Sequence, residues 1–435
     1  MSKLHIVGGI PLRGRIRVGG RKNSAVAVIP AALLASGPSI IENIPNISDV
    51  NNYVTILKAM GVGIEQPTPD SLRFNPKFLT TPIPPQEPVK RMRASYYLLG
   101  VLLGRFGEAE VTLPGGCDIG QRPIDQHLKG FRALGATVEI EHGVVKLKAS
   151  RLVGTTIYLD VVSVGATINI MLAACLAEGT TVIENAAKEP HVVDLANYLN
   201  AMGGRVVGAG TDVIKVRGVG ELRGATHAII PDEIEAATFM IAAAATRGDV
   251  TIENVIPKHL DSVTAKLREA GVHIDENGDW VRVRMSDRPK AVNVKTAVYP
   301  GFPTDAQQPM TALLSVAGGT SMVSDTIWES RFKHVGELQR MGAQIKVEGR
   351  TAVIYGVDRL TGTEVTATDL RAGAALLTAG LMAEGESVIC GIEHIERGYE
   401  STEAKFCSLG AKLTRLSDSQ AKRGPHLQVV HGSSS

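Results

Sequence analysis

The amino-acid sequence predicts an α/β protein of two lobes, each built from three copies of one unit of helices and strands. Two series of glycines carry this prediction, because each glycine marks the end of a helix-like segment. In the first series they stand 68 to 74 residues apart, at Gly61, Gly135, Gly203, Gly271, Gly342 and Gly410. In the second series each glycine precedes its partner by 23 to 28 residues, at Gly37, Gly107, Gly179, Gly248, Gly319 and Gly385. Agreement of two markers over six periods indicates an internal repeat.

Each unit contains two helices and the strands that follow them. An Ala/Leu-rich helix ends at a glycine of the second series, and an alternating strand comes directly after it. In residues 236–246, for example, small or apolar residues occur on nearly all sides of the helix. A helix that is apolar on all faces is buried, so we expect these helices inside each lobe and the sheets outside. The alternative is a set of ordinary α/β domains with incidental similarity.

The composition is that of a globular chain without a dominant charge. The 435 residues are 44% hydrophobic and 21% charged, with a net charge of +2 and 4% aromatic residues. Neither a broad basic surface nor a base-stacking platform is indicated, so we expect no nucleic-acid partner. An anion site in this chain therefore has to come from a few placed cations.

The cysteines and the N-terminal residues indicate the cellular compartment. No cysteine pair has CxxC spacing, so neither a zinc site nor a disulfide framework is indicated for Cys117, Cys175, Cys390 and Cys407. The first residues lack the apolar core of a signal peptide, and no apolar run reaches the length of about 18 residues that a membrane span needs. We expect a cytoplasmic protein without membrane association.

The Ala/Leu-rich helix of each unit begins with polar residues, and two of them are unusual. Ser163, Asp305 and Asp369 stand where serine and aspartate are good N-caps, and capping is the plain explanation for them. Lys22 and Arg93 are different, because a cation at a helix start opposes the helix dipole. An anionic ligand would account for them, since helix N-termini also bind phosphates and carboxylates.

Among three further arginines, one fits the same pattern. Arg371 stands two residues inside its helix, and Arg331 and Arg397 lie on expected loops after strands. If the repeat directs several of these ends at one cleft, they form a strongly anion-binding site.

A glycine loop carries the cysteine that we single out. The expected strand 109–113 breaks at two adjacent glycines, and Cys117 stands at the tip of the turn that follows. Arg122 and the start of a helix at Asp125 come next, and both favour a thiolate. A reactive cysteine and an inert free cysteine in a turn are both compatible with this stretch alone.

Several sequence blocks extend these observations to a family. They are KNSA at Lys22, MRAS at Arg93, LPGGCDIGQRPID around Cys117, SVGAT at Ser163, FPTD at Asp305, SRFKHV at Arg331, TDLRAG at Asp369 and HIERGYE at Arg397. With these blocks the chain resembles the UDP-N-acetylglucosamine enolpyruvyl transferases, the MurA family, nearly from end to end. The variants KRMRASYYLLG and YPGFPTDAQQPMTALL are similar to the second isozyme of low-GC Gram-positive bacteria.

The resemblance implies the two-lobed inverse α/β barrel of the enolpyruvyl transferases, with six repeats of about 70 residues, three in each lobe. We expect residues 21–230 to form the first lobe, which carries the Cys117 loop. Residues 1–20 and 231–420 are expected to form the second lobe, and residues 421–435 a flexible tail. The expected oligomeric state is a monomer or a weak homo-oligomer.

The reaction that the resemblance implies moves the enolpyruvyl group of phosphoenolpyruvate to the 3-hydroxyl of UDP-N-acetylglucosamine. Phosphate leaves after addition and elimination through a tetrahedral ketal, as the first committed step of peptidoglycan synthesis. By the same resemblance Cys117 is the general acid and forms a covalent adduct, and Asp305 accepts or orients the hydroxyl proton. The loop of Cys117 would close over the substrates. Fosfomycin, an epoxide mimic of phosphoenolpyruvate, is expected to alkylate Cys117.

The resemblance also implies which residues bind the two substrates, without a metal or a cofactor. Phosphoenolpyruvate would be held by Lys22, Asn23, Arg122 and Arg397. The UDP-sugar would be bound by Arg93, Arg122, Pro123, Ile124, Asp125, Gln126, Val161, Val162, Ser163, Val164, Asp305 and Ile327. Further substrate-binding residues are expected at Arg331, Asp369 and Arg371.

The chain departs from the usual family pattern at three positions. Where the family has IPDRIEAGTF, this chain has Glu233 in place of arginine and Ala237 in place of glycine, at the expected hinge between the lobes. Asp118 follows Cys117 where alanine is common. An extra carboxylate at that position would raise the pKa of the thiol, because like charges disfavour each other.

Two other functions compete with this interpretation. The sister enzyme that acts on shikimate 3-phosphate shares the fold and phosphoenolpyruvate, but it lacks a cysteine loop of this form. A catalytically silent paralogue would be expected to have lost Cys117, Asp305 or Lys22, and all three are present.

The expected role of Cys117 gives a testable prediction. The Cys117→Ser variant should lose the covalent adduct and most turnover, because a hydroxyl is a far weaker acid than a thiol, while it still binds the UDP-sugar. Mass spectrometry of the protein and phosphate release measure the two effects. Turnover at the wild-type rate in this variant would remove Cys117 from the mechanism.

Overall fold

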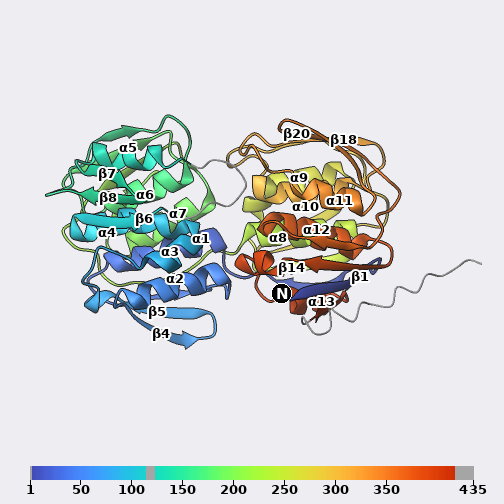
Figure 1. Cartoon of the computed structure of the whole chain (residues 1–435), viewed down its shortest axis with the longest axis horizontal. Coiled ribbons are helices and arrows are strands. Elements are labelled where there is room, and N and C mark those ends of the chain that lie inside the picture. Colours follow the sequence, from blue (N-terminus) through green and yellow to red (C-terminus); the bar gives the residue numbers. More distant parts are fainter. Residues whose placement is uncertain (1, 114–122, 417–435) are drawn as a thin grey trace, which may run out of the picture.

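The computed structural model describes residues 2–113 and 123–416. They form two lobes that lie side by side, with the N-terminal strands on the second lobe (Figure 1). One hydrophobic core joins buried residues between Ala25 and Ile229, and the other joins residues between Ala236 and Leu413 with the N-terminal residues from Leu4 to Val18. The exact lobe boundaries expected from the sequence stay a prediction, and the expected tail 421–435 lies outside the described residues.

The strands of the first lobe form three sheets on its outside. Along these strands buried and more exposed residues alternate, as expected for a sheet with one face on a core. In spatial order the sheets are β13 (Thr226–Ala228), β3 (Ser39–Glu42), β5 (Ser71–Asn75), β4 (Gly63–Thr68); β11 (Arg205–Val207), β12 (Val213–Arg217), β10 (Thr180–Glu184), β9 (Thr156–Tyr158); and β6 (Glu108–Thr112), β8 (Val144–Lys148), β7 (Thr137–Glu141).

The second lobe has three four-stranded sheets, two of which contain a strand from the N-terminus. In spatial order they are β21 (Glu364–Thr366), β22 (Glu386–Cys390), β1 (Lys3–Val7), β23 (Lys412–Leu416); β15 (His273–Asn277), β16 (Trp280–Arg284), β14 (Asp249–Glu253), β2 (Arg13–Arg17); and β17 (Val294–Lys295), β18 (Thr320–Ser324), β20 (Thr351–Tyr355), β19 (Gln344–Glu348).

The repeat predicted from the glycines is visible in the sheet topology. In each of the five four-stranded sheets, one edge strand runs parallel to its neighbour, and the other two strands add antiparallel. The sixth sheet, β6–β8–β7, contains only the antiparallel part among the described residues. Both lobes therefore repeat one supersecondary unit.

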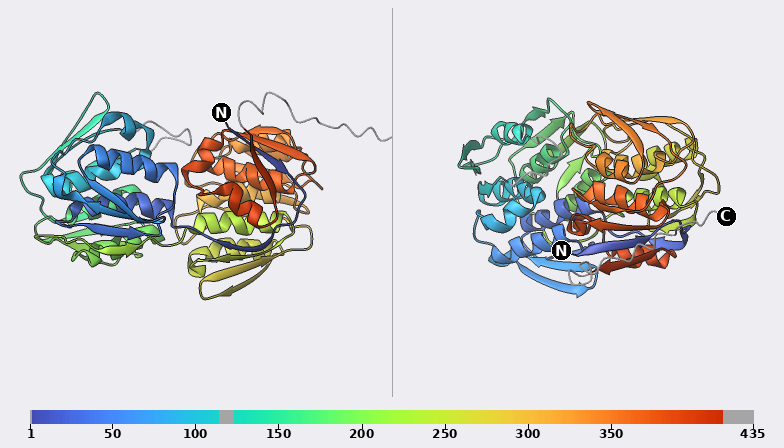
Figure 2. Two further views of the ribbon diagram at one scale, coloured as in Figure 1. Left: turned by 90° about the horizontal axis from the view of Figure 1, so that it is seen from below. Right: turned by 45° about the vertical axis from the view of Figure 1, so that its right-hand side comes forward.

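The Ala/Leu-rich helices lie inside the lobes, as expected. They are α1 (Lys22–Ala31), α4 (Tyr97–Phe106), α6 (Val164–Ala174), α8 (Glu233–Ala245), α10 (Gln307–Leu314) and α12 (Leu370–Met382). All 13 residues of α8 are buried, in agreement with its small residues on every side. Figure 2 shows the sheets on the outside of each lobe and these helices between them. The predicted fold class is therefore confirmed.

The remaining helices complete the units around this interior. The second helix of each unit is one of α2 (Ser48–Ala59), α5 (Asp125–Ala133), α7 (Pro190–Ala201), α9 (Asp261–Glu269), α11 (His334–Arg340) and α13 (Thr402–Ser408). A further short helix is α3 (Gln86–Arg91), and the 3-10 turns are η1 (Ala32–Leu34), η2 (Pro76–Phe78), η3 (Arg93–Tyr96), η4 (Pro257–Leu260), η5 (Thr304–Ala306) and η6 (Ile392–Arg397).

The glycines of the first series close these second helices. All six have left-handed backbone angles, with φ between 91° and 98°, which a residue with a side chain adopts only with strain. The second series is less uniform. Gly37 and Gly248 do not have a positive φ, and Arg247 takes the left-handed conformation beside Gly248 instead. The first series is thus confirmed as helix caps, and the second only in part.

In the part of the chain that the structure describes, no helix has both the length and the apolar character needed to cross a membrane.

The close approach of α4 and α6 gives a prediction for stability. A Cβ atom at Gly100 would lie 2.4 Å from the carbonyl oxygen of Asn169, whereas at Gly104, one turn later, the nearest atoms would be at 3.4 Å. We expect Gly100→Ala to lower the free energy of unfolding by about 1–3 kcal/mol through overpacking. Gly104→Ala is the matched control and should be neutral or stabilising, since alanine favours helix.

Denaturant unfolding of the two variants measures this difference. Equal stability of the two variants would show that α4 and α6 do not pack as closely as described.

Candidate active site between the lobes

The chain passes between the lobes at residues 19–21 and again at residues 230–232, and these two segments are hydrogen-bonded to each other. Asp232 N–H donates to the carbonyl of Gly19 at 3.0 Å, and Arg21 N–H donates to the carbonyl of Ile230 at 2.8 Å. Gly20 is in direct contact with the first lobe, because a Cβ atom there would lie 1.7 Å from the carbonyl oxygen of Asn43. The crossings therefore form a fixed strap at one side of the interlobe gap.

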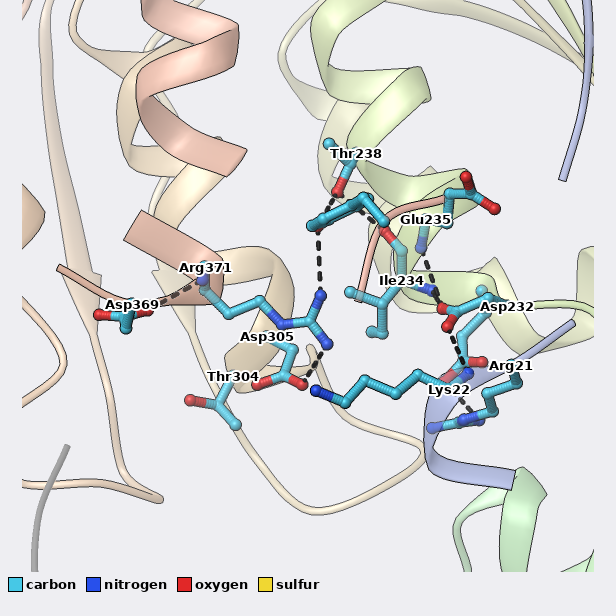
Figure 3. A network of polar contacts seen from close by, with 12 residues as sticks. Arg21, Lys22, Asp232, Ile234, Glu235, Thr238, Thr304, Asp305, Asp369 and Arg371 are labelled. Carbon is cyan, nitrogen blue, oxygen red and sulfur yellow. Dashed lines mark hydrogen bonds and ion pairs between the residues drawn. The ribbon is translucent and has the colours of Figure 1, made fainter. Parts of the chain in front are cut away.

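Asp232 joins the N-termini of two helices from different lobes at this strap. Its Oδ1 accepts the N–H groups of Ile234 and Glu235 at 2.8 and 3.0 Å and so caps α8. Its Oδ2 accepts the N–H of Lys22 at 2.9 Å, at the start of α1 (Figure 3). Because one carboxylate caps both helices, the starts of α1 and α8 lie together at the gap.

Asp305 lies in η5 at the same gap and is held by two buried arginines. Arg371 Nη2 lies 2.9 Å from Asp305 Oδ2, and Arg331 Nη2 binds Oδ1. The arginine side chains are 7% and 5% exposed, and that of Asp305 is 25% exposed. Asp305 makes no cap to α10, so the plain explanation of this residue as a helix cap is wrong. Its carboxylate is instead an ionised group fixed from two sides.

Arg371 is in turn held by the second lobe. Its Nη1 donates to the hydroxyl of Tyr399 at 3.2 Å, and that hydroxyl bonds Thr238 Oγ1 at 2.8 Å. Burial alone would lower the pKa of Arg371, but Asp305 and Tyr399 raise it above its ordinary value, so the guanidinium stays charged. Asp369 N-caps α12 through the N–H groups of Arg371 and Ala372, as the capping interpretation predicts.

A second charged group lies where α1, α2 and η6 meet. Lys22 Nζ lies 2.8 Å from Asp49 Oδ2, and Arg397 Nε lies 3.2 Å from Asp49 Oδ1. Lys22 and Asp49 belong to the first lobe and Arg397 to the second, so this group crosses the gap. Burial lowers the pKa of Lys22. Burial would raise the pKa of Asp49, but Lys22 and Arg397 hold it below its usual value.

The expected UDP-sugar residues of the first lobe come together at the ends of α5 and α6. Gln126 Oε1 accepts the N–H of Asp160 at 2.9 Å, and its Nε2 donates to Asp160 Oδ2 at 3.1 Å. Ser163 caps α6 through Ala166 N–H. Next to this link Val161 is 59% exposed and Val162 36% exposed, although both are apolar.

The other expected residues lie near these groups. Asn23 is in the first turn of α1, and Pro123, Ile124 and Asp125 lead into α5. Asp325 accepts the N–H groups of Ile327 and Trp328 at 2.9 Å and so fixes the loop that carries Ile327.

Arg93 lies in η3, and its charge acts on His127 of α5. Burial, and then the charge of Arg93, lower the pKa of His127 to about 3, so this histidine is neutral. Cys117, Asp118 and Arg122 lie outside the described residues. Within those residues, no group of three or more His, Cys, Asp or Glu side chains could hold a metal ion.

The structure brings to this site four residues to which the sequence assigned no part in binding or catalysis, although Asp232 stands at one of the expected polar helix starts. Asp49 and Tyr399 contact expected cations, and Asp232 caps α1 and α8. His191 lies in the first turn of α7, and burial, with the charge of Arg21, lowers its pKa well below the usual value, whereas Asp305 raises it. Asp49 and Asp232 both stand in the first turn or cap of a helix, where an acidic residue needs no other explanation.

Glu233, one of the departures from the family pattern, has a partner at the strap. Its Oε1 lies 2.5 Å from Arg21 Nη1, and the side chains are 10% and 6% exposed. Burial raises the pKa of Glu233 to about 7, although Arg21 opposes this shift.

This shift predicts the pH dependence of stability. A carboxyl whose pKa is raised in the folded protein stabilises it below pH 4.5 and loses that contribution as the pH rises to about 7. Relative to wild type, Glu233→Gln should therefore gain up to about 3 kcal/mol of unfolding free energy between those limits. Denaturant unfolding across the pH range measures the difference. A constant difference between the proteins would mean that Glu233 does not titrate in this range.

Comparison with known proteins shows the family of the chain. The family model for EPSP synthase (3-phosphoshikimate 1-carboxyvinyltransferase) matches residues 6–406. A relative from Clostridium botulinum named UDP-N-acetylglucosamine 1-carboxyvinyltransferase is 61% identical over 417 residues, which cover 96% of this chain and 100% of that protein. A relative with the same name and the number 2, from Geobacillus kaustophilus, is 56% identical over 415 residues, with 95% and 97% coverage.

Solved structures show the same fold. The enolpyruvyl transferase NikO from Streptomyces tendae has a TM-score of 0.85 at 27% identity, with 95% of this chain and 98% of that chain covered. An EPSP synthase from Acinetobacter baumannii has a TM-score of 0.75 at 21% identity, with 95% and 100% covered, and supports the fold alone. The chain therefore belongs to the UDP-N-acetylglucosamine 1-carboxyvinyltransferases, within the enolpyruvyl transferase family.

Proposed function

We propose that this protein transfers the enolpyruvyl group of phosphoenolpyruvate to the 3-hydroxyl of UDP-N-acetylglucosamine and releases phosphate. The observation that carries the proposal is the pairing of Asp305 with Arg331 and Arg371 beside the cations Lys22 and Arg397 in one interlobe gap. The names of relatives at 55–61% identity support the same substrates. In a bacterial cell this reaction would serve peptidoglycan synthesis, in the cytoplasm.

Asp305 would receive the sugar. Arg331 and Arg371 fix the position of its carboxylate, which would orient the 3-hydroxyl and accept its proton as the oxygen attacks. The hydroxyl oxygen bonds to the central carbon of the enol while a proton adds to the methylene carbon. Loss of phosphate and of one methyl proton then restores the enol double bond.

Lys22 and Arg397 would bind the anionic groups of phosphoenolpyruvate. Both are presented by elements that begin or end at the gap, and both carry a positive charge that the phosphate and carboxylate require. Arg93, Gln126 and the residues 161–164 would bind the UDP-sugar on the side of the first lobe. Cys117 would supply the proton to the methylene carbon, and Asn23 and Arg122 would complete the phosphoenolpyruvate site.

Arg331 and Arg371 have a different proposed role from direct substrate binding. Their side chains are nearly fully buried, and each is directed to Asp305. We propose that they orient Asp305 and keep it ionised, while Asp369 fixes the start of α12 that carries Arg371. The protein would act on its small-molecule substrates as a monomer or a weak homo-oligomer.

One experiment separates this function from that of the sister enzyme, whose name the matching family model carries. Phosphate release from phosphoenolpyruvate is measured with UDP-N-acetylglucosamine, with shikimate 3-phosphate, and without an acceptor. We expect release with the UDP-sugar at least about 100-fold faster than with shikimate 3-phosphate, because a site built to hydrogen-bond one acceptor rejects another strongly. Faster release with shikimate 3-phosphate would overturn the proposal.

A further inference from the structure

Asp49 occupies an unusual place between two cations from different lobes. Its two carboxylate oxygens bind different partners, Oδ2 to Lys22 Nζ at 2.8 Å and Oδ1 to Arg397 Nε at 3.2 Å. The side chain of Asp49 is only 9% exposed. A buried carboxylate is costly unless it is paired, and here both of its oxygens are paired.

The surroundings of Lys22 explain what such a carboxylate does. The charged groups that act on its ammonium are Asp49 from α2, Arg397 from η6 and Arg371 from α12. Burial and the two arginines favour the neutral amine, whereas Asp49 favours the charged form. The stem of Lys22 is also confined, since a Cβ atom at Gly398 would lie 3.2 Å from its Cδ.

We propose that Asp49 is a positioning residue that holds Lys22 charged and aligned with Arg397 across the gap, so that phosphoenolpyruvate meets a ready pair of cations. This inference rests on the proposed function, because it assigns Lys22 and Arg397 to that substrate. Asp49 itself does not need to contact the substrate. An anion bound between Lys22 and Arg397 would pair with one cation from each lobe, as the carboxylate of Asp49 does.

The test is the pH dependence of phosphoenolpyruvate use at saturating UDP-N-acetylglucosamine. In Asp49→Asn the charge that supports the Lys22 ammonium is gone, so its pKa falls. The alkaline limb of kcat/KM for phosphoenolpyruvate should move down by at least about one pH unit, while KM for the UDP-sugar stays at the wild-type value. In Asp49→Glu the carboxylate is retained, so the alkaline limb should lie close to its wild-type pH.

Two controls make the test specific. Asp249→Asn removes a carboxylate that is also paired with an arginine, Arg282, but on β14 of the outer sheet, and it should leave the limb in place. In a Lys22→Arg background the guanidinium does not titrate, so Asp49→Asn should cause no shift. A limb at the wild-type position in Asp49→Asn, or a shift that persists with Arg at position 22, would overturn the proposal.

A binding measurement separates this proposal from the proposed function. Titration calorimetry with inorganic phosphate, across the same pH range, needs no turnover and should show the same shift between wild type and Asp49→Asn. Absence of UDP-sugar turnover in the wild type would count against the function alone, whereas identical phosphate binding in both proteins would count against Asp49. If Asp49→Asn fails to fold, Asp49→Glu decides, because it keeps the carboxylate charge, and an alkaline limb displaced by about one pH unit or more in this variant would overturn the positioning role.

Discussion

The carboxylate of Asp232 is the interaction on which the rest of the site depends. It accepts backbone N–H groups from α1 of the first lobe and from α8 of the second, and it lies on the strap where the chain passes between the lobes. Each lobe repeats one unit three times, and helices of several units begin near this strap. The starts of α1, α10 and α12 therefore bring Lys22, Asp305 and Arg371 to one gap (Figure 3).

A site that collects cations must be stable before its anionic substrate arrives. In this protein two carboxylates serve that purpose in different ways. Asp305 lies between Arg331 and Arg371, and Asp49 lies between Lys22 and Arg397. The first pair of cations is nearly buried, so it orients the carboxylate, while Arg397 is 27% exposed and remains accessible to a ligand. This difference in burial supports the proposal that Arg331 and Arg371 act through Asp305, whereas Arg397 would meet phosphoenolpyruvate.

The architecture could be predicted from the sequence because it is repeated. Six left-handed glycines and six buried helices give signals that reinforce one another, and Lys22 stood out because its charge opposes the dipole of its own helix. The contacts of Asp49 and Asp305 in the site could not be predicted from such local signals. An aspartate at a helix start already has a local explanation, and the partners that matter lie far away in sequence, 348 residues from Asp49 to Arg397 and 66 residues from Asp305 to Arg371. The first pair follows from the packing of one lobe on the other, and the second from the packing of two repeats within the second lobe. No local sequence pattern encodes either contact.

The most direct test of this account is a crystal structure of the protein with UDP-N-acetylglucosamine and inorganic phosphate. The account predicts that both ligands lie in the same interlobe gap, with a phosphate oxygen within hydrogen-bond distance of Lys22 and Arg397. It also predicts the sugar 3-hydroxyl on Asp305, with Arg331 and Arg371 still bound to that carboxylate. Phosphate bound away from Lys22 and Arg397, or a sugar that does not reach Asp305, would contradict it.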